Sequence, residues 1–407
     1  MSGETTSWPS FPLGDICRTT SGGTPSRKRA DYFLGDIPWV KSGELTDGLV
    51  SEVSEFITEE AVANSSAKLF PQGTLLIAMY GATVGKLGVL AKPAATNQAV
   101  CAIFPPPELD SKFLFWFLRF KRNYLIDQAV GGAQPNISQS ILREFMVPVP
   151  PIDVQIETVA EIEKQFSRLD EAVANLQRVK ANLKRYKASV LKAAVEGRLV
   201  ETEGGWQQVK LGEIALSVRN GYSHKPDAET GTRIFRISAV RPMELAADDV
   251  RFLSGEPADY ENFLAGAGDV LFTRYNGSRD YVGVCAAVPA GLPPTLYPDK
   301  LIRVRVPNEK LLPAFLVIAA STGEARAFIE SMIRTTAGQS GVSGTDIKAI
   351  PLSVPSMAEQ VRIVAEVDRH ISIIREVEAE IDTNLKRTQS LRQATLTREF
   401  GVAVNQI

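Results

Sequence analysis

The chain has 407 residues, 44% of them apolar, and a net charge of −2, which fits roughly two to four folded domains and excludes a disordered chain. Its three cysteines, Cys17, Cys101 and Cys285, form no CxxC motif, and with only two histidines we expect neither a metal site nor a disulfide framework. The first residues lack the pattern of a signal peptide, and the apolar stretch 311–320 is too short to cross a bilayer. We therefore expect a cytoplasmic protein with reduced thiols and no membrane contact. The overall charge alone does not indicate a nucleic-acid binder.

An internal repeat dominates the sequence. Four blocks of similar residues recur in the same order, pairing 8–16 with 206–214, 73–89 with 268–284, 134–138 with 339–343, and 147–155 with 352–360. Within the second pair, Gly88 is matched to Gly283. The repeat predicts two copies of one fold in a single chain.

Each copy divides into a domain of about 150 residues and a long helix. Short apolar runs broken by Gly, Pro and Asn predict strands, among them 74–79 and 301–306, and the alternation in 301–306 predicts a half-exposed sheet. The runs 113–120 and 314–320 predict short buried helices. The predicted fold class is α+β. The predicted boundaries are 1–150 for the first domain, 151–200 for the central spacer helix, 201–353 for the second domain and 354–407 for the C-terminal spacer helix.

Apolar residues at alternating spacings of three and four predict a coiled-coil seam in both long helices. Prolines before 152 and 356 predict where the helices begin, and Gly197 and Gly401 predict where they end. The seam residues are Val159, Ile162, Phe166, Leu169, Val173, Leu176, Leu183, Val364, Val367, Ile371, Ile374, Ile381 and Leu385. The two helices of one chain then pack as an antiparallel coiled coil that separates two pseudo-symmetric domains. Association of the helices between chains is the alternative.

Two similar domains held apart by helices suit duplex DNA, because two-fold proteins bind half-sites separated along the double helix. The two copies differ in sequence, so their half-sites are expected to differ. A set of motifs supports this interpretation. They are Ser21–Ser26, Gly35–Lys41, Asn64–Pro71, Met79–Lys86, Ala95–Ala99 and Gly131–Ser138.

With these motifs the whole chain resembles the specificity subunit of type I restriction-modification systems, whose two target-recognition domains are each followed by a helical spacer. The resemblance implies a subunit that does no chemistry and binds a bipartite, asymmetric sequence in double-stranded DNA. It also implies two methyltransferase subunits and two restriction (motor-nuclease) subunits as partners. S-adenosylmethionine, ATP and Mg²⁺ are then expected in those partners and no cofactor in this chain.

Candidate DNA contacts in the first half centre on 81–86, which is not a phosphate-binding loop because only three residues separate its glycines and Leu87 follows Lys86. Small residues let the backbone approach a groove, and Thr83 and Lys86 add donors, although a structural turn is an alternative. The basic run at 26–29 suggests phosphate contacts, whereas Trp39 is expected in the core. The candidates are Thr24, Ser26, Arg27, Lys28, Lys41, Gly81, Ala82, Thr83, Lys86, Gln134 and Asn136.

In the second half, Arg274, Asn276 and Arg279 occupy the equivalent loop and have side chains suited to guanine and adenine edges. The alternative is that the arginines pair with Asp269 or Asp280. Gln339, like Gln134, suits adenine, although a role in a turn explains both residues as well. The candidates are Arg236, Arg274, Tyr275, Asn276, Arg279 and Gln339.

Two other functions compete with DNA recognition. A coiled-coil protein scaffold that never binds DNA fits the coiled coils and the acidic total charge, but the divergence of the two domains, with small, basic and amide residues at equivalent turns, opposes it. The excess of basic residues in 178–198, a net of +6, partly answers the acidic total charge. A self-contained nuclease or methyltransferase is disfavoured because the sequence shows no adenine-methylation motif, no S-adenosylmethionine glycine motif and no set of residues for a histidine triad. We therefore expect no catalytic residues.

Overall fold

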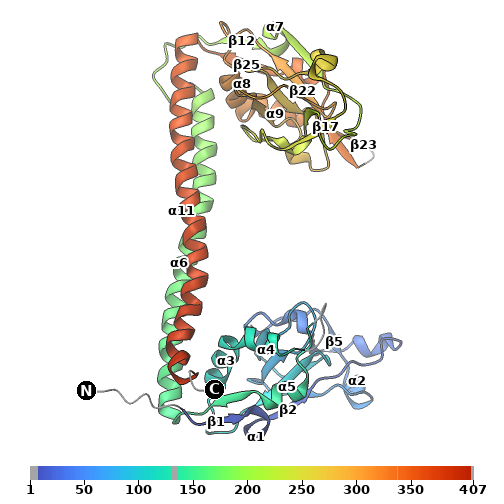
Figure 1. Cartoon of the computed structure of the whole chain (residues 1–407), viewed down its shortest axis with the longest axis vertical. Coiled ribbons are helices and arrows are strands. Elements are labelled where there is room, and N and C mark those ends of the chain that lie inside the picture. The colour runs from blue at the N-terminus through green and yellow to red at the C-terminus, as the bar shows by residue number, and fades with distance from the viewer. Residues whose placement is uncertain (1–7, 130–134, 337, 405–407) are drawn as a thin grey trace, which may run out of the picture. The chain divides into compact units, whose positions relative to one another are not determined.

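The computed structural model describes residues 8–129, 135–336 and 338–404, and the chain divides into two units (Figure 1). Unit 1 contains the chain up to Leu176 together with the segment from Thr383 onward, and unit 2 contains Gln177–Asp382. The division falls within two long helices, α6 (Ile152–Val195) and α11 (Met357–Val404), so each unit holds one mixed α/β domain and a part of both helices. This confirms the predicted α+β class with two domains and two long helices.

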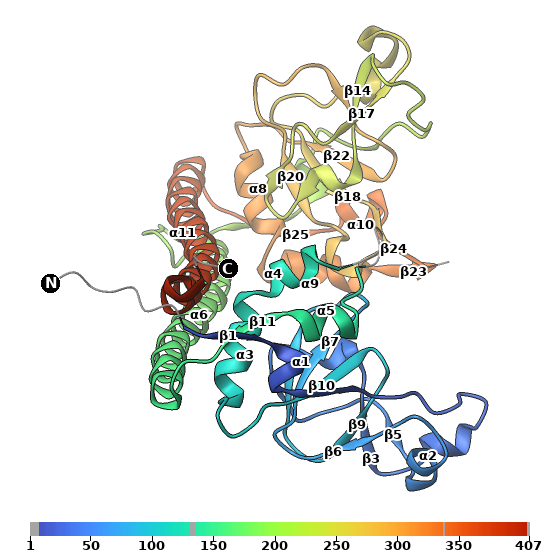
Figure 2. The ribbon, with the colours of Figure 1, turned by 60° about the horizontal axis from the view of Figure 1, so that its bottom comes forward.

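The domain of unit 1 is built on a five-stranded sheet with the order β2-β10-β7-β8-β4, and Figure 2 shows β7 and β10 side by side in it. These strands are β2 (Arg18–Ser21), β10 (Val100–Phe104), β7 (Leu75–Ala78), β8 (Leu87–Leu90) and β4 (Gly48–Val50). A second sheet has the order β5 (Phe56–Ile57), β3 (Ile37–Val40), β9 (Ala94–Thr96) and β6 (Leu69–Phe70), and β1 (Ser10–Pro12) pairs with β11 (Met146–Pro148). The helices are α1 (Leu13–Ile16), α2 (Glu59–Ala63), α3 (Ser111–Phe120), α4 (Arg122–Asp127) and α5 (Gln139–Glu144).

The domain of unit 2 repeats this plan around a four-stranded sheet with the order β13 (Ser217–Asn220), β22 (Leu301–Arg305), β18 (Val270–Thr273) and β20 (Cys285–Ala287). Four smaller sheets are β17 (Val250–Leu253), β14 (Thr232–Phe235) and β21 (Thr295–Leu296); β12 (Gln207–Lys210) with β25 (Pro351–Val354); β15 (Val240–Arg241) with β16 (Glu244–Leu245); and β19 (Tyr275–Asn276), β24 (Gln339–Gly341) and β23 (Arg334–Thr336). The helices are α7 (Leu211–Ile214), α8 (Pro313–Ala320), α9 (Gly323–Met332) and α10 (Gly344–Lys348).

Strand register corrects one detail of the repeat. Leu87 pairs with Ile77 in unit 1, and Cys285 pairs with Phe272 in unit 2, so residues after the central loop are related by an offset of 198. Gly283 therefore corresponds to Gly85 rather than to Gly88. Both glycines have positive φ angles, and both amides donate to the end of the preceding strand, to Ala78 O and Thr273 O respectively. The loop of unit 2 is three residues longer, which the sequence match did not take into account.

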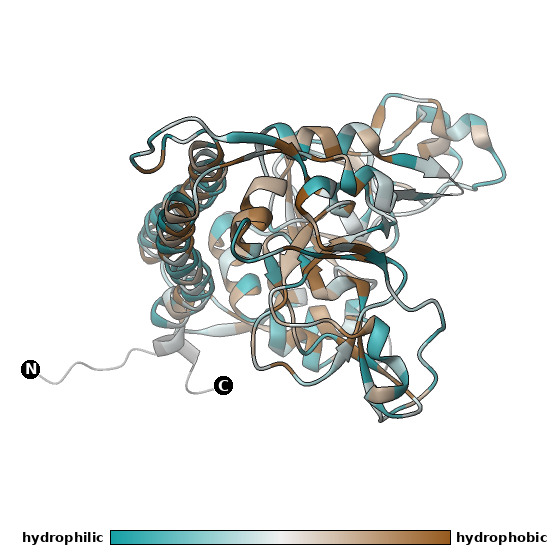
Figure 3. Ribbon diagram, turned by 90° about the horizontal axis from the view of Figure 1, so that it is seen from above, coloured by the Kyte–Doolittle hydropathy of each residue, from teal (hydrophilic) through white to brown (hydrophobic). Residues whose placement is uncertain are grey.

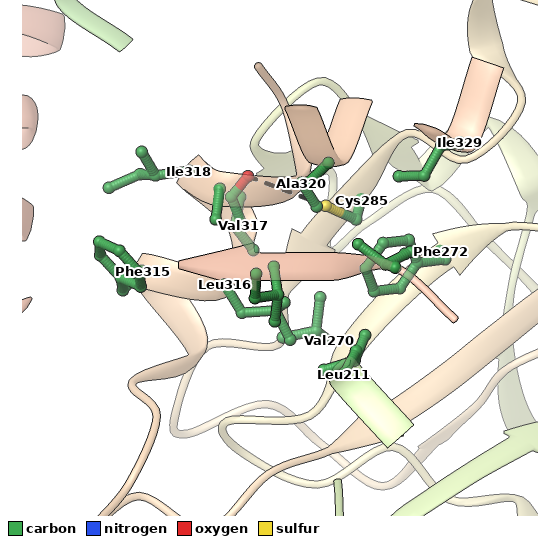
Figure 4. Close-up of a cluster of buried hydrophobic side chains, with 14 of the residues drawn as sticks. Leu211, Val270, Phe272, Cys285, Phe315, Leu316, Val317, Ile318, Ala320 and Ile329 are labelled. Carbon is green, nitrogen blue, oxygen red and sulfur yellow. Dashed lines mark hydrogen bonds between the residues drawn. The ribbon is translucent and has the colours of Figure 1, made fainter. Parts of the chain in front are cut away.

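The main core of each domain lies between its central sheet and its helices. In unit 2, Phe272 and Cys285 from the sheet pack with Phe315 and Leu316 of α8 (Figure 4). The runs predicted as short buried helices are α3 and α8, which confirms that prediction. The prediction of a half-exposed strand at 301–306 is wrong. The first four residues of β22 are all buried, including the charged Arg303. Arg303 can be buried because it lies beside the buried carboxylate of Asp269, with 3.8 Å between Arg303 Nε and Asp269 Oδ2.

Both long helices begin where the prolines predict. Ser356 precedes α11 and forms a capping box with Glu359, in which the Ser356 amide donates to the Glu359 carboxylate at 2.9 Å. α6 ends as predicted at Gly197, whose φ of +67° lets the Arg198 amide donate to Ala193 O at 2.9 Å. The predicted end at Gly401 is wrong, because α11 continues to Val404.

The two long helices pack antiparallel within each unit. In unit 1 the helices are joined by Asp170–Arg392 and Glu161–Arg398, and in unit 2 by Lys180–Asp382 at 2.6 Å and by Tyr186 with His370 at 3.0 Å. In each pair of contacts, later residues of α6 meet earlier residues of α11. In Figure 3 hydrophilic residues cover much of both helices, and hydrophobic residues recur along them.

The seam is buried mainly where it meets a domain. Val159, Ile162, Phe166, Val367, Ile371, Ile374 and Ile381 are buried, whereas Leu169, Val173, Leu176, Leu183, Val364 and Leu385 are half-buried. Phe166 packs against Trp116 of α3, with ring centroids 4.6 Å apart, and Phe400 of α11 packs against three further phenylalanines of unit 1. The buried Ile363, which was not predicted, belongs to the core that contains α8. The seam therefore attaches the helices to the domains as well as to each other.

Candidate nucleic-acid interface

The loop that follows β7 in unit 1 contains four of the predicted DNA contacts and is fixed at both ends. Tyr80 forms a backbone bridge with Asn136, and the Ile137 amide donates to Met79 O at 2.8 Å. Ser138 caps the next helix, α5, by accepting from the Ile141 amide at 3.2 Å. The loop 80–86 and Asn136, which is exposed, therefore lie together. Gln134 lies outside the described residues.

Side chains of the loop are partly engaged with the domain. The Thr83 hydroxyl donates to Ser42 O at 2.7 Å, which places Thr83 next to the segment that begins with Lys41. Gly81 is exposed and has a φ of +93°, and within 4 Å of the position of a side chain there lies only Ser42 Oγ, at 4.0 Å, so its backbone is accessible from outside. Ala82 is exposed beside it. The Lys86 ammonium lies 3.0 Å from Asp47 Oδ2.

Asp47 is a residue that sequence reasoning missed. Its side chain is only 8% exposed, its φ is +66°, and its carboxylate forms ion pairs with both Lys86 and Arg122. Burial opposes its ionisation, but the amide of Leu87 and the charges of Arg122 and Lys86 outweigh burial and hold the pKa of Asp47 below its usual value. The only signal in the sequence is the Asp-Gly turn at 47–48, because the partners lie far away along the chain. Asp47 anchors the base of the loop.

The basic run of unit 1 forms a second group of candidates. Arg27 and Lys41 share one carboxylate, Glu55, at 2.6 and 2.7 Å, and their hydrogen bonds lower the pKa of Glu55. The Arg27 guanidinium also lies over Phe33, 4.3 Å from the ring centroid. Ser26 and Lys28 are exposed, and Thr24 donates to the Gln98 side chain.

Trp39 is buried, and its Nε1 donates to Gly23 O at 3.0 Å, which confirms it as a core residue.

Unit 2 brings its candidate residues together through a small sheet. Tyr275 pairs with Gly341 and Asn276 pairs with Ser340, so the loop after β18 is joined to the segment that begins at Gln339. Ser343 then caps α10 by accepting from the Asp346 amide at 3.1 Å, as Ser138 caps α5. The two units thus build the same arrangement of a loop and a capped segment from different residues.

Arg274 and Arg279 do not form ion pairs with Asp269 or Asp280, which was the alternative to DNA contacts. Arg274 Nη1 donates to Asp299 O at 3.4 Å, and its guanidinium lies 4.7 Å from the Tyr275 ring centroid. Its Nε is buried without a partner among the described residues. Arg279 donates to Glu330 O at 3.1 Å. Arg236, which is half exposed, lies 3.6 Å from Asp249.

Asp269 is instead buried and held by Arg305, which donates to both carboxylate oxygens at 2.7 and 2.8 Å.

The basic stretch at the end of α6 is partly paired. Lys180 reaches Asp382, Lys192 lies 3.8 Å from Glu196, and Arg198 also pairs with Glu196. Lys184 is exposed and Lys187 is half-buried. Within the described ranges, no helix is long and apolar enough to span a membrane, and His, Cys, Asp and Glu form no group of three or more suited to a metal ion.

Comparison with known proteins connects this architecture to one family. Residues 6–185 match the family model of the type I restriction modification DNA specificity domain. Over 410 residues the chain is 28% identical to the specificity subunit of the type I restriction enzyme EcoKI from Escherichia coli K12, covering 97% of this chain and 88% of that subunit. It is 23% identical over 408 residues to the StySPI specificity subunit from Salmonella potsdam, with the same coverage of 97% and 88%.

Solved structures show the same fold. A chain from a structure on complex assembly and conformational transition of the type I R-M system gives a TM-score of 0.76 at 18% identity, covering 97% of both chains. The HsdS subunit from Thermoanaerobacter tengcongensis gives a TM-score of 0.60 at 18% identity, covering 98% of this chain and 97% of that one.

The part of the chain that matches a DNA specificity domain is the domain of unit 1 with most of α6. Over 97% of its length the chain is similar to type I restriction-modification specificity subunits, as the resemblance of its motifs predicted, and its fold is that of the solved structures.

Proposed function

We propose that this chain binds a bipartite, asymmetric DNA site, with each unit reading one half-site. The observation that carries the proposal is the pair of equivalent loops, 80–86 in unit 1 and 275–284 in unit 2, each joined to the segment that leads into a capped helix. The loops hold different residues, small and hydroxyl side chains in one and Asn276 and Arg279 in the other. Different side chains at equivalent positions suit different base sequences.

We further propose that the chain is a non-catalytic subunit of a cytoplasmic complex. Its partners in this proposal are two methyltransferase subunits, which bind S-adenosylmethionine, and two restriction subunits, which use ATP and Mg²⁺. The family supports this assignment, because the relatives are named specificity subunits of type I restriction enzymes. The exposed hydrophilic surfaces of α6 and α11 are available for such partners.

An exchange of domains tests the proposal. Residues 8–150 are replaced by the equivalent domain of a relative with a different specificity, and the complex with the methyltransferase is allowed to select sites from random duplex DNA. We expect one half of the selected site to change and the other half to stay the same. The parent chain and a chain with residues 206–355 replaced serve as controls. A site in which both halves change, or neither, would contradict one half-site per unit.

A further inference from the structure

Unit 1 contains a cavity of about 400 Å³ that is lined by four cationic side chains. Arg119 is the penultimate residue of α3, Arg122 begins α4, Lys86 closes the candidate loop, and Arg392 comes from the last part of α11. Phe166 of α6 forms part of the wall. All of these residues belong to unit 1.

The acidic residues nearby do not balance these cations. Asp47 holds Lys86 and Arg122, and Asp170 holds Arg392. The Arg119 side chain has no hydrogen bond or ion pair among the described residues. Its guanidinium stacks on two aromatic rings, 5.0 Å from the centroid of Trp116 and 5.2 Å from that of Phe166. Four cations therefore face two carboxylates, which leaves a net charge of +2 around the cavity.

The two arginines also have unused donors. Arg392 Nε is buried and has no hydrogen-bond partner in the described part of the chain. Burial lowers the pKa of Arg119, because its charge is removed from water without a carboxylate in contact with it. A planar guanidinium fixed against aromatic rings suits a bidentate contact with an oxyanion. Gln389 and Gln393 add amide donors to the same wall.

We propose that this cavity is a binding site for a phosphate group, held by Arg119 and Arg392. The phosphate has two possible sources, free inorganic phosphate and a phosphodiester of bound DNA. The second source rests on the proposed function and is favoured by Lys86, which lies in both the cavity and the candidate DNA loop. A phosphodiester held here would fix the position of the duplex without reading its sequence.

Unit 2 lacks the same site. Gln155 bonds the amide of Asp110 ahead of α3, and Gln360 bonds the amide of Leu312 ahead of α8, which relates the two helices by an offset of 202. Arg119 then corresponds to Ser321. Phe166, which aligns with Ile371 on the long helices, has no aromatic counterpart. The proposed phosphate site therefore belongs to unit 1.

Titration of inorganic phosphate into the full-length chain, followed by calorimetry, tests the site directly. We expect saturable binding that weakens about tenfold or more in Arg119→Gln, because that substitution removes a charge-assisted contact without orphaning a carboxylate. Arg18→Gln is the matched control, because Arg18 also stacks on an aromatic ring, 4.0 Å from the Phe104 centroid, but lies outside the cavity. If Arg119→Gln does not fold, Arg119→Lys keeps the charge and should weaken binding by a smaller factor.

A second arm identifies the source of the phosphate. The affinity of the complex for its DNA is measured against salt concentration for the parent, Arg119→Gln and Arg18→Gln. If the site holds a DNA phosphate, the slope of log K against log salt falls by about 0.9 in Arg119→Gln alone, with the recognised bases unchanged. Phosphate binding with an unchanged slope would assign the site to free phosphate. No saturable phosphate binding together with an unchanged slope would overturn the proposal, whatever sequence the complex recognises.

Discussion

Gln155 and Gln360 make the same set of hydrogen bonds in the two units. Each is fully buried at the start of a long helix. Gln155 Nε2 donates to Glu108 O and Pro150 O at 2.9 and 2.7 Å, and Oε1 accepts from the Asp110 amide at 2.8 Å. Gln360 repeats these contacts with Lys310 O and Pro355 O, both at 3.0 Å, and with the Leu312 amide at 2.8 Å. One side chain thus joins the start of a long helix to the segment before α3 or α8.

Replacing Gln155 by Met should destabilise unit 1. The substitution keeps the volume but leaves the Asp110 amide and two carbonyls without their partner, and an unsatisfied buried group costs about 1–3 kcal/mol. Denaturant unfolding monitored in unit 1 measures the loss, and Gln360→Met should have the same effect in unit 2. Gln177→Met, at an exposed position of α6, is the control and should change stability by less than about 0.5 kcal/mol. Equal effects of all three substitutions would refute this role.

Asp269→Ala should lower the unfolding free energy of unit 2 by more than Gln360→Met does. It leaves Arg303, which is only 5% exposed, without the carboxylate beside it, and removes both hydrogen bonds of Arg305. Breaking a buried pair by removing one partner typically costs about 3–5 kcal/mol. The double variant Asp269→Ala with Arg303→Met should recover part of the lost stability. No recovery, measured by thermal unfolding, would show that the buried charge is not the cause.

Arg274→Ala should alter specificity rather than assembly. Loss of one bidentate base contact costs about 1–3 kcal/mol and relaxes one base pair of one half-site. The readout is the set of sequences selected by the complex, because a purely structural role would lower affinity without changing the preferred bases. Lys310→Ala removes one exposed positive charge from the same unit and should leave the selected site unchanged. An identical site and affinity for Arg274→Ala would remove this residue from the candidate contacts.

Stability of unit 2 should fall above pH 9 through Cys285. Burial raises the pKa of this thiol to about 12 from 9.0, so only the unfolded state ionises between these values. The protonated thiol makes its full contribution to the unfolding free energy below pH 9. This contribution is lost between pH 9 and 12, and at pH 10 it has fallen by about 1 kcal/mol. The variant Cys285→Ala has no thiol at this position and should not show this loss. The difference in unfolding free energy between parent and variant should therefore shrink by that amount from pH 7.5 to pH 10, and a constant difference would contradict the account.

The sequence predicted the long helices well, because heptad spacing is a local signal that many residues share. The sequence predicted fewer of the buried residues near the ends of these helices. Ile363, Leu396 and Phe400 are buried because their partners are in the domains, so no heptad rule on the helices alone could identify them. Gly401 predicts the end of α11, but the helix continues past it to Val404.

The candidate site shows the same limit. The repeat predicted which loops correspond, and the structure joins each loop to the segment that leads into a capped helix. The anchor Asp47 escaped notice because its partners, Lys86 and Arg122, are 39 and 75 residues away along the chain. The alternation of residue types around Arg303 predicts a half-exposed strand, because it cannot show that a charge is buried beside an acid. A local pattern in the sequence contains no information about contacts between residues that are distant along the chain.

DNA recognition by this chain can be tested by mapping adenine methylation across the DNA of cells that carry the chain and its methyltransferase partner. The control cells carry the partner alone. Two units with different loops should produce a new methylated motif with two unlike halves separated by a gap of fixed length, present only with this chain. A stable complex with the partner that yields no new motif would contradict DNA recognition by this chain and favour a protein scaffold.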